Sequence, residues 1–170
     1  MSNVPTDISY FIKDKNGKEV EKNLFDVIDD SDVWEKNGLT IIGLKGVQKL
    51  AKAVGIVEKD FRTEVQPTEG NKQQHVVNIW VGFKNDADPN NFVRGSGEAS
   101  MLNTGKIVEN KAKGERRYEE YACIDSQYRY AMADKRAYCR AVLKLVGLFG
   151  IYSSVESSSF SPDDIQNYDY

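Results

Sequence analysis

The chain has 170 residues, of which 40% are hydrophobic and 11% aromatic, and its formal net charge is −3. This length and composition suffice for one domain with a sizeable core. They argue against a membrane-spanning protein, because no run approaches roughly 18 consecutive apolar residues. The first residues also lack the basic and then apolar order of a signal peptide. We therefore expect a cytoplasmic protein that does not interact with membranes.

The charge is distributed unevenly along the chain. Residues 1–38 carry five Lys and nine acidic residues, a balance of −4, and residues 151–170 carry four acids and no base. The remaining residues, 39–150, have a balance of +5. The acidic total does not exclude a polyanionic ligand, because such binding depends on local clusters of cations. We expect an acidic N-terminal segment with a small hairpin over 1–38, a core over 39–152 and a disordered acidic tail over 153–170.

The first predicted elements are a hairpin and a strand followed by a helix. The run Ile8–Ile12 precedes Asn16-Gly17, a pair that suits a tight hairpin turn. Leu39–Ile42 reads as a short strand. Apolar residues at helical spacing then predict a helix over 44–54, which Gly55 ends.

A meander of strands follows, with candidates at Phe61–Val65, Val76–Phe83 and Phe92–Leu102. In the second strand the period of two places Val77, Ile79, Val81 and Phe83 on one face, and Asn78 and Trp80 on the other. The third strand contains Gly95-Ser96-Gly97. These glycines indicate a bulge or a place where another segment approaches the backbone closely.

A basic connection, Lys106–Arg117, leads into a long helix predicted over Tyr121–Gly147. Both cysteines, Cys123 and Cys139, fall in this helix, roughly 24 Å apart along its axis, so we expect reduced thiols. The elements together predict an α+β fold, in which an antiparallel β-meander packs against a long C-terminal helix and a shorter helix.

Each predicted helix has a basic face opposite its apolar face. We expect these faces to meet a negatively charged ligand, although a solvated helix face is the simpler explanation of such a pattern. The long helix carries Arg129, Arg136, Arg140 and Lys144 in one arc, and the shorter helix carries Lys45, Lys49 and Lys52.

No catalytic constellation is present, and we interpret the protein as a non-enzyme without a cofactor. The single histidine, His75, has no Cys or acid nearby at metal-ligand spacing. Asp86 and Asp88 lie in a run whose composition is typical of a turn, which needs no metal. Gly95-Ser96-Gly97-Glu98 lacks the Lys of a phosphate-binding loop.

Cations that track a backbone, together with an aromatic face for stacking, are typical of proteins that bind single-stranded nucleic acid. The cation candidates are those of the two helices, with Arg94, Arg116 and Arg117 in second rank. Trp80 is the stacking candidate because it interrupts a polar strand face. The alternative for Trp80 is a packing role beneath a helix or in a subunit contact.

A family resemblance adds to this interpretation. Residues 134–143, Asp-Lys-Arg-Ala-Tyr-Cys-Arg-Ala-Val-Leu, resemble the Arg-Ala-x-x-Arg-Ala helix of single-strand annealing proteins of the phage Sak and bacterial DdrA type, relatives of the eukaryotic annealing recombinase. Residues 39–56 look like the strand and helix that open that core. The resemblance covers residues 39–150. It implies a homo-oligomeric ring or filament, binding of single-stranded DNA at Arg136 and Arg140, and annealing without ATP.

We therefore expect a DNA-binding protein that promotes strand annealing in recombination, repair or replication, encoded by a phage or mobile element and acting in the host cytoplasm. One alternative is a plain single-strand-binding protein of phage replication, whose acidic tail recruits replication or recombination proteins. Another is a protein-interaction module that binds no nucleic acid. The sequence predicts that replacing Arg136 and Arg140 together by Ala weakens DNA binding without unfolding the chain.

Overall fold

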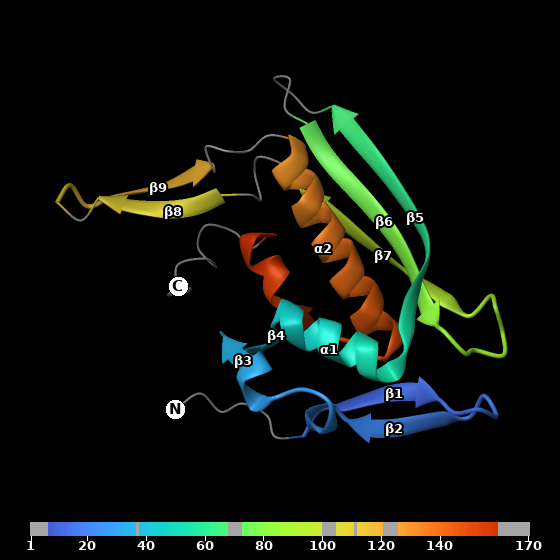
Figure 1. Ribbon diagram of the computed structural model, residues 1–170. Coiled ribbons are helices and arrows are strands. Elements are labelled where there is room, and N and C mark those ends of the chain that lie inside the picture. The colour runs from blue at the N-terminus through green and yellow to red at the C-terminus, as the bar shows by residue number, and fades with distance from the viewer. Residues whose placement is uncertain are drawn as a thin grey trace.

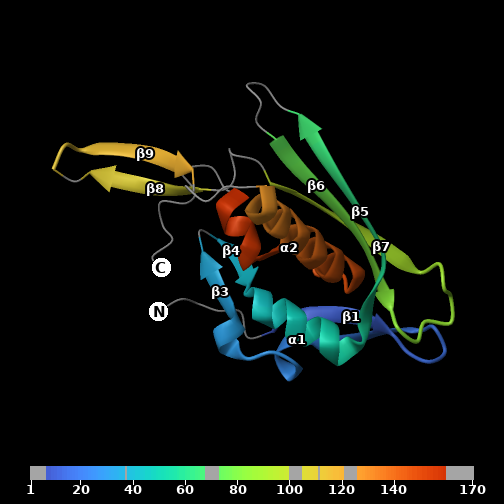
Figure 2. The same ribbon diagram turned by 45° about the horizontal axis from the view of Figure 1, so that its top comes forward.

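The computed structural model describes residues 7–36, 38–67, 73–99, 105–110, 112–120 and 126–159. It has an α+β fold of antiparallel sheets and two helices, as the sequence predicted. The helices are α1 (Leu44–Val54) and α2 (Ser126–Leu145), and α2 lies at the centre of the molecule (Figures 1 and 2). The strands are β1 (Ser9–Lys13), β2 (Glu19–Asn23), β3 (Val33–Lys36), β4 (Leu39–Ile42), β5 (Ile56–Pro67), β6 (Gln73–Phe83), β7 (Phe92–Ala99), β8 (Gly105–Asn110), β9 (Glu115–Glu120) and β10 (Ile151–Ser153).

The three-stranded meander β5-β6-β7 is the largest sheet, and α2 packs on one of its faces (Figure 1). Val77, Ile79 and Val81 of β6 are at most 1% exposed on that face. This confirms the predicted period of two. The sequence underestimated the length of β5, which begins directly after α1 and reaches Pro67.

Two glycines of β7 allow α2 to lie unusually close to the sheet. A Cβ atom at Gly97 would collide with the backbone of Ala133, and one at Gly95 with the backbone of Ala137. Both alanines are fully buried. The glycines therefore mark a close approach rather than a bulge, which is one of the two possibilities that the sequence left open.

A second core lies on the other side of α2, between this helix, α1 and the β1–β2 hairpin. Helix α1 contributes Val47 and Leu50, both fully buried, and ends at Gly55 with φ +73°, as predicted. Tyr10 of β1 is 1% exposed, and the Phe11 amide donates to the Val146 carbonyl at 2.8 Å. The acidic N-terminal segment thus forms part of the core, which the sequence analysis assigned to residues 39–152 alone.

The segment after α2 corrects the prediction of a disordered tail from residue 153. Strand β10 pairs in parallel with β4 and ends at Ser153, which is 2% exposed. A 3-10 helix, η4 (Ser154–Ser159), follows, and its Glu156 is 5% exposed. Composition alone suggested disorder, but Glu156 is paired with Arg140 of α2, a partner that the local sequence does not reveal. Residues 160–170 of the predicted tail lie outside the described residues.

Two further segments differ from the sequence prediction. The basic connection Lys106–Arg117 contains most of a hairpin, β8–β9, rather than a plain loop. In addition to the predicted hairpin, the acidic N-terminal segment 1–38 contains a 3-10 turn at Asp30–Asp32 and strand β3. The expected first turn of the long helix, residues 121–125 with Cys123, lies outside the described residues. Cys139 is buried with a free thiol.

Candidate nucleic-acid interface

Arg136 of α2 does not face solvent. Its side chain is the largest fully buried one among the described residues, at 0% exposure. Its Nε donates to the Val155 carbonyl at 3.2 Å and its Nη1 to the Glu98 carbonyl at 2.6 Å. Arg136 therefore joins η4 to β7, and it cannot contact a phosphate in this fold.

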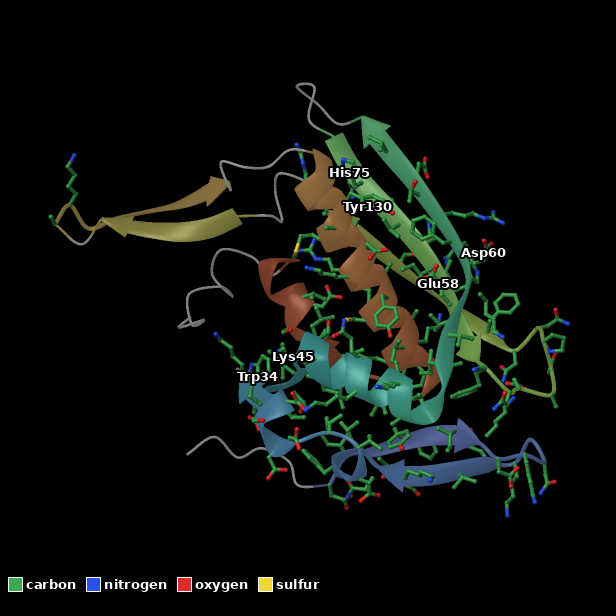
Figure 3. The ribbon with its side chains drawn as sticks, viewed as in Figure 1. Trp34, Lys45, Glu58, Asp60, His75 and Tyr130 are labelled. Atoms are coloured by element: carbon green, nitrogen blue, oxygen red, sulfur yellow. The ribbon has the colours of Figure 1, made fainter. Side chains whose placement is uncertain are left out.

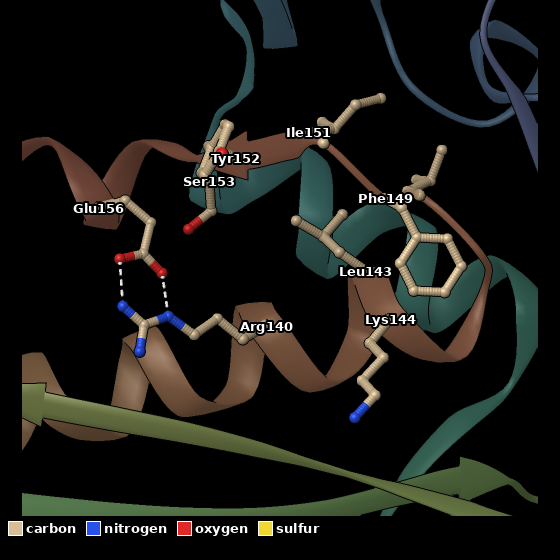
Figure 4. A pocket seen from close by; sticks show the side chains of 10 residues that line it. Arg140, Leu143, Lys144, Phe149, Ile151, Tyr152, Ser153 and Glu156 are labelled. Atoms are coloured by element: carbon tan, nitrogen blue, oxygen red, sulfur yellow. Dashed lines mark hydrogen bonds and ion pairs between the residues drawn. The ribbon is translucent and has the colours of Figure 1, made fainter.

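Arg140, one turn further along α2, is held by two carboxylates and a carbonyl. Its Nε and Nη2 donate to Glu156 at 2.6 and 2.8 Å (Figure 4). Its Nη1 donates to the Ser96 carbonyl at 2.7 Å and to Glu98 at 2.9 Å, and Nη2 also reaches Glu98 at 3.5 Å. Burial lowers the pKa of Arg140, but these hydrogen bonds outweigh burial and raise its pKa above the ordinary value. All five N–H donors of a guanidinium are thus engaged.

Both arginines bond to carbonyls of β7, which is an edge strand of its sheet. An edge strand presents unpaired backbone groups that proteins normally cover. Arg136 and Arg140 cover the carbonyls of Glu98 and Ser96 in this way. The prediction that these two arginines form a DNA cradle is wrong for the described structure, because α2 is packed on both sides and its basic arc lies inside.

Arg129 also differs from the prediction of a solvent-facing cation. It is 9% exposed and lies near His75 of β6, which is 6% exposed. Burial, followed by the positive charge of Arg129, lowers the pKa of His75. Arg129 is thus a buried residue of α2 rather than part of a solvent-facing basic surface.

The three lysines of α1 have different environments. Lys49 donates to Asp29 at 2.5 Å and to Asp32 at 2.6 Å, so its charge is shared with the protein's own acids. Lys45, which lies near Trp34 (Figure 3), and Lys52 are both exposed. Neither of these two forms an ion pair with another described residue. Figure 3 shows Lys45 away from Asp60 of β5. Because Arg136 and Arg140 are bonded within the fold, α1 and α2 do not form a joint basic cradle.

Trp80 and Arg94 are the predicted residues that the fold brings together. They are directly paired across β6 and β7, on the face of the sheet that points away from α2. Arg62 of β5 adds a cation that the sequence did not single out, with its Cζ atom 5.3 Å from the centre of the Trp80 ring. The sequence pattern could not identify Arg62, because its position depends on the register between β5 and β6.

Two further residues extend this surface. Lys59 lies at the irregularity of β5, and its side chain passes over Gly82, next to Trp80. Phe92, paired with Gly82, is 44% exposed. We call the surface formed by these residues the Trp80 face: Lys59, Arg62, Trp80, Phe92 and Arg94.

The acids near the Trp80 face weaken its charge only in part. Asp60 pairs with Trp80 in register and lies 3.6 Å from Arg62, but the two side chains are 55% and 74% exposed. Such an exposed pair contributes little and can open. The Glu98 side chain is engaged by Arg140. Glu64, two residues beyond Arg62 on the same face, is a further exposed acid. The three cations Lys59, Arg62 and Arg94 thus outnumber Asp60 and Glu64 around Trp80.

The last predicted cation, Lys144, is exposed near the C-terminal end of α2, where it lines a cleft. Among the described residues, no three His, Cys, Asp or Glu side chains form a possible metal site. No described helix is long and apolar enough to cross a membrane.

Comparisons of the chain with protein-family models, curated proteins and solved structures gave no match.

Proposed function

We propose that this protein binds single-stranded nucleic acid on the Trp80 face. The observation that carries the proposal is the row Arg62, Trp80 and Arg94, which crosses all three strands of the sheet on its uncovered side. A half-exposed indole between two guanidinium groups offers a stacking surface for one base and cations for the flanking phosphates. Stacking on an aromatic side chain contributes about 1–3 kcal/mol per base.

The geometry favours single strands over duplexes. The Trp80 indole can stack only with a base whose face is free, and duplex bases are stacked on each other. The exposed guanidinium of Arg62, which lies over the ring, has to move aside or cover the base from its other face. The flanking arginines carry no base preference, because phosphate contacts are independent of sequence. We therefore propose a binder of unpaired strands with little sequence specificity.

Strand annealing without ATP, by a homo-oligomer, is the finer proposal. It is supported by the resemblance of residues 39–150 to the annealing family. The two arginines that carry the family motif hold α2 to β7 and η4 here, so the motif does not indicate where the DNA would bind. A plain coating protein would use the Trp80 face in the same way but would not accelerate strand pairing.

The test uses the fluorescence of Trp80. The chain has two tryptophans, so Trp34→Phe leaves Trp80 as the single indole. We expect oligothymidylate to quench this fluorescence, and duplex DNA of the same length to quench it much less. The matched control is Trp80→Phe, in which Trp34 alone reports and should not respond.

Three measurements separate the candidate functions. Absence of quenching and of binding in a gel shift, for DNA and RNA alike, would reject the proposal and favour a protein-interaction module. Binding without faster pairing of complementary strands would favour a coating protein. Faster pairing by the protein without ATP, reduced by Trp80→Ala, would support annealing.

A further inference from the structure

A cleft of about 540 Å³ lies beside the C-terminal end of α2, between this helix and the segment that runs into β10 (Figure 4). Its inner wall is apolar, with Leu143 and Leu148 at most 5% exposed. The volume falls within the range of about 300–1,000 Å³ that is typical of small-ligand sites. The proposed Trp80 face does not include this cleft.

Phe149 is the most unusual residue of the cleft. It is 77% exposed, more than any other large hydrophobic side chain among the described residues. Figure 4 shows its ring at the mouth of the cleft, beside Leu143 and close to Lys144. An exposed ring of this kind offers a free face for stacking.

The polar groups of the cleft leave one charge available. Arg140 and Glu156 neutralise each other at its far end. Lys144 is exposed and forms no ion pair with the described residues. The hydroxyl of Ser153 also lines the cleft, and it is buried without a hydrogen-bond partner among the described residues. The cleft thus combines an apolar wall, a stacking ring and a single cation.

The cleft is continuous with the start of β7. A second cleft, of about 430 Å³, shares Phe149 and Lys144 with the first and reaches Asn91 and Val93. Phe92, between these two residues, belongs to the Trp80 face. A strand that leaves the Trp80 face at Phe92 can therefore turn around the beginning of β7 and reach Phe149.

We infer that this cleft is a second binding position on the same strand, which takes one unpaired base against Phe149 and its phosphate at Lys144. This inference rests on the proposed function. An apolar wall with one cation matches a nucleotide, which has one planar base and one charged phosphate. An acidic peptide also fits a lysine, but the continuity with the Trp80 face favours the nucleotide.

The test compares a short oligothymidylate that spans only the Trp80 face with a longer one that can reach the cleft. Phe149→Ala should weaken the longer oligonucleotide by about fivefold or more, since stacking on an aromatic ring is worth roughly 1–3 kcal/mol per base. The short one should bind as before. Phe149→Tyr keeps the ring and should restore binding. Because Phe149 is exposed, these variants should fold, which circular dichroism checks.

A fluorescent base analogue in the oligonucleotide shows which base contacts Phe149. With 2-aminopurine at the end of the longer oligonucleotide, Phe149→Ala and Lys144→Gln should relieve the quenching, whereas 2-aminopurine within the segment at Trp80 should stay quenched. Unchanged affinity and quenching in Phe149→Ala, with Trp80→Ala still defective, would overturn the inference and leave the proposed function intact. A synthetic peptide of residues 160–170 tests the acidic-peptide alternative. If Phe149→Ala weakens binding of this peptide but not of the longer oligonucleotide, the cleft is a peptide site and the inference fails.

Discussion

Two arginine-bearing surfaces of this molecule differ in whether their arginines are bonded within the fold or exposed to solvent. On α2, Arg136 and Arg140 are bonded to the protein's own carbonyls and carboxylates. On the outer face of the sheet, Arg62 and Arg94 flank Trp80 and remain exposed. The difference arises because α2 is covered on two sides, whereas α2 covers only one side of the sheet. A basic arc on a helix therefore indicates a ligand only when no second layer packs on it.

The largest effect should come from the contact that holds α2 on the sheet. Gly97→Ala places a methyl group against the backbone of Ala133, which no rotamer change can relieve. We expect a loss of about 3 kcal/mol or more in the free energy of unfolding, at the upper end of overpacking effects. Urea denaturation followed by circular dichroism measures it.

Gly43→Ala is the control, because a Cβ there meets its neighbours at 3.5 Å, an ordinary contact, and φ is −59°. It should change the urea midpoint little. Equal stability of the two variants would show that α2 does not lie as close to β7 as the structure has it.

The next effect tests whether the α2 arginines support the fold. Arg140→Ala removes the guanidinium that engages Glu156, whose side chain is 7% exposed, and breaking a buried ion pair costs about 3–5 kcal/mol. The Arg140 side chain is 35% exposed, so screening by solvent should reduce the cost to about 2 kcal/mol. The sequence predicted the opposite, namely weaker DNA binding in a folded protein.

Arg140→Ala with Glu156→Gln separates the two views. Removing both charges should recover part of the lost stability, because a neutral amide replaces the buried Glu156 carboxylate and only the more exposed Glu98 loses its arginine. A stable Arg140→Ala protein with weakened DNA binding would instead restore the predicted role of Arg140 at the DNA.

The sequence predicted the parts of the fold that depend on local pattern. The period of two in β6 and the left-handed Gly55 at the end of α1 are local signals, and both are confirmed. The fate of Arg136 was not predictable, because its partners are the carbonyls of Val155 and Glu98, 19 and 38 residues away. Arg62 could not be identified for the same reason, because its position beside Trp80 depends on the register between β5 and β6. Trp80 and Arg94 could be singled out because each stands alone on a strand whose alternation is clear.

A smaller effect is expected at the Trp80 face itself. Arg62→Ala with Arg94→Ala removes two exposed cations, and each phosphate contact on a single strand contributes about 0.7 to the salt slope. We expect the slope of log affinity against log salt to fall by about 1.4, with the urea midpoint unchanged. Fluorescence titration at several salt concentrations measures it.

The matched control removes two charges from elsewhere. Lys18→Ala with Lys22→Ala takes them from the β1–β2 hairpin and its turn, where both side chains are exposed. If this control lowers the slope as much as the arginine pair does, the effect reflects net charge and the Trp80 face is not the binding surface.

The smallest effect should come from Lys49, the predicted cation that is engaged by the protein's own acids. Hydrogen bonding to Lys49 lowers the pKa of Asp32 below the ordinary carboxyl value of 3.8. The stability that this hydrogen bond contributes is therefore fully present above pH 3.8, and it is lost as the pH falls through the lower pKa of Asp32 in the folded protein. The pKa of Lys49 is raised by Asp29 and Asp32, so its contribution is present below the ordinary 10.5 and is lost as pH rises through the folded value above it. Lys49→Ala should therefore lower the urea midpoint slightly and by a constant amount across neutral pH, with the difference vanishing in acid. Its affinity for oligothymidylate should match that of the unchanged protein, and a clear loss of affinity would place the nucleic acid on α1 instead of the sheet.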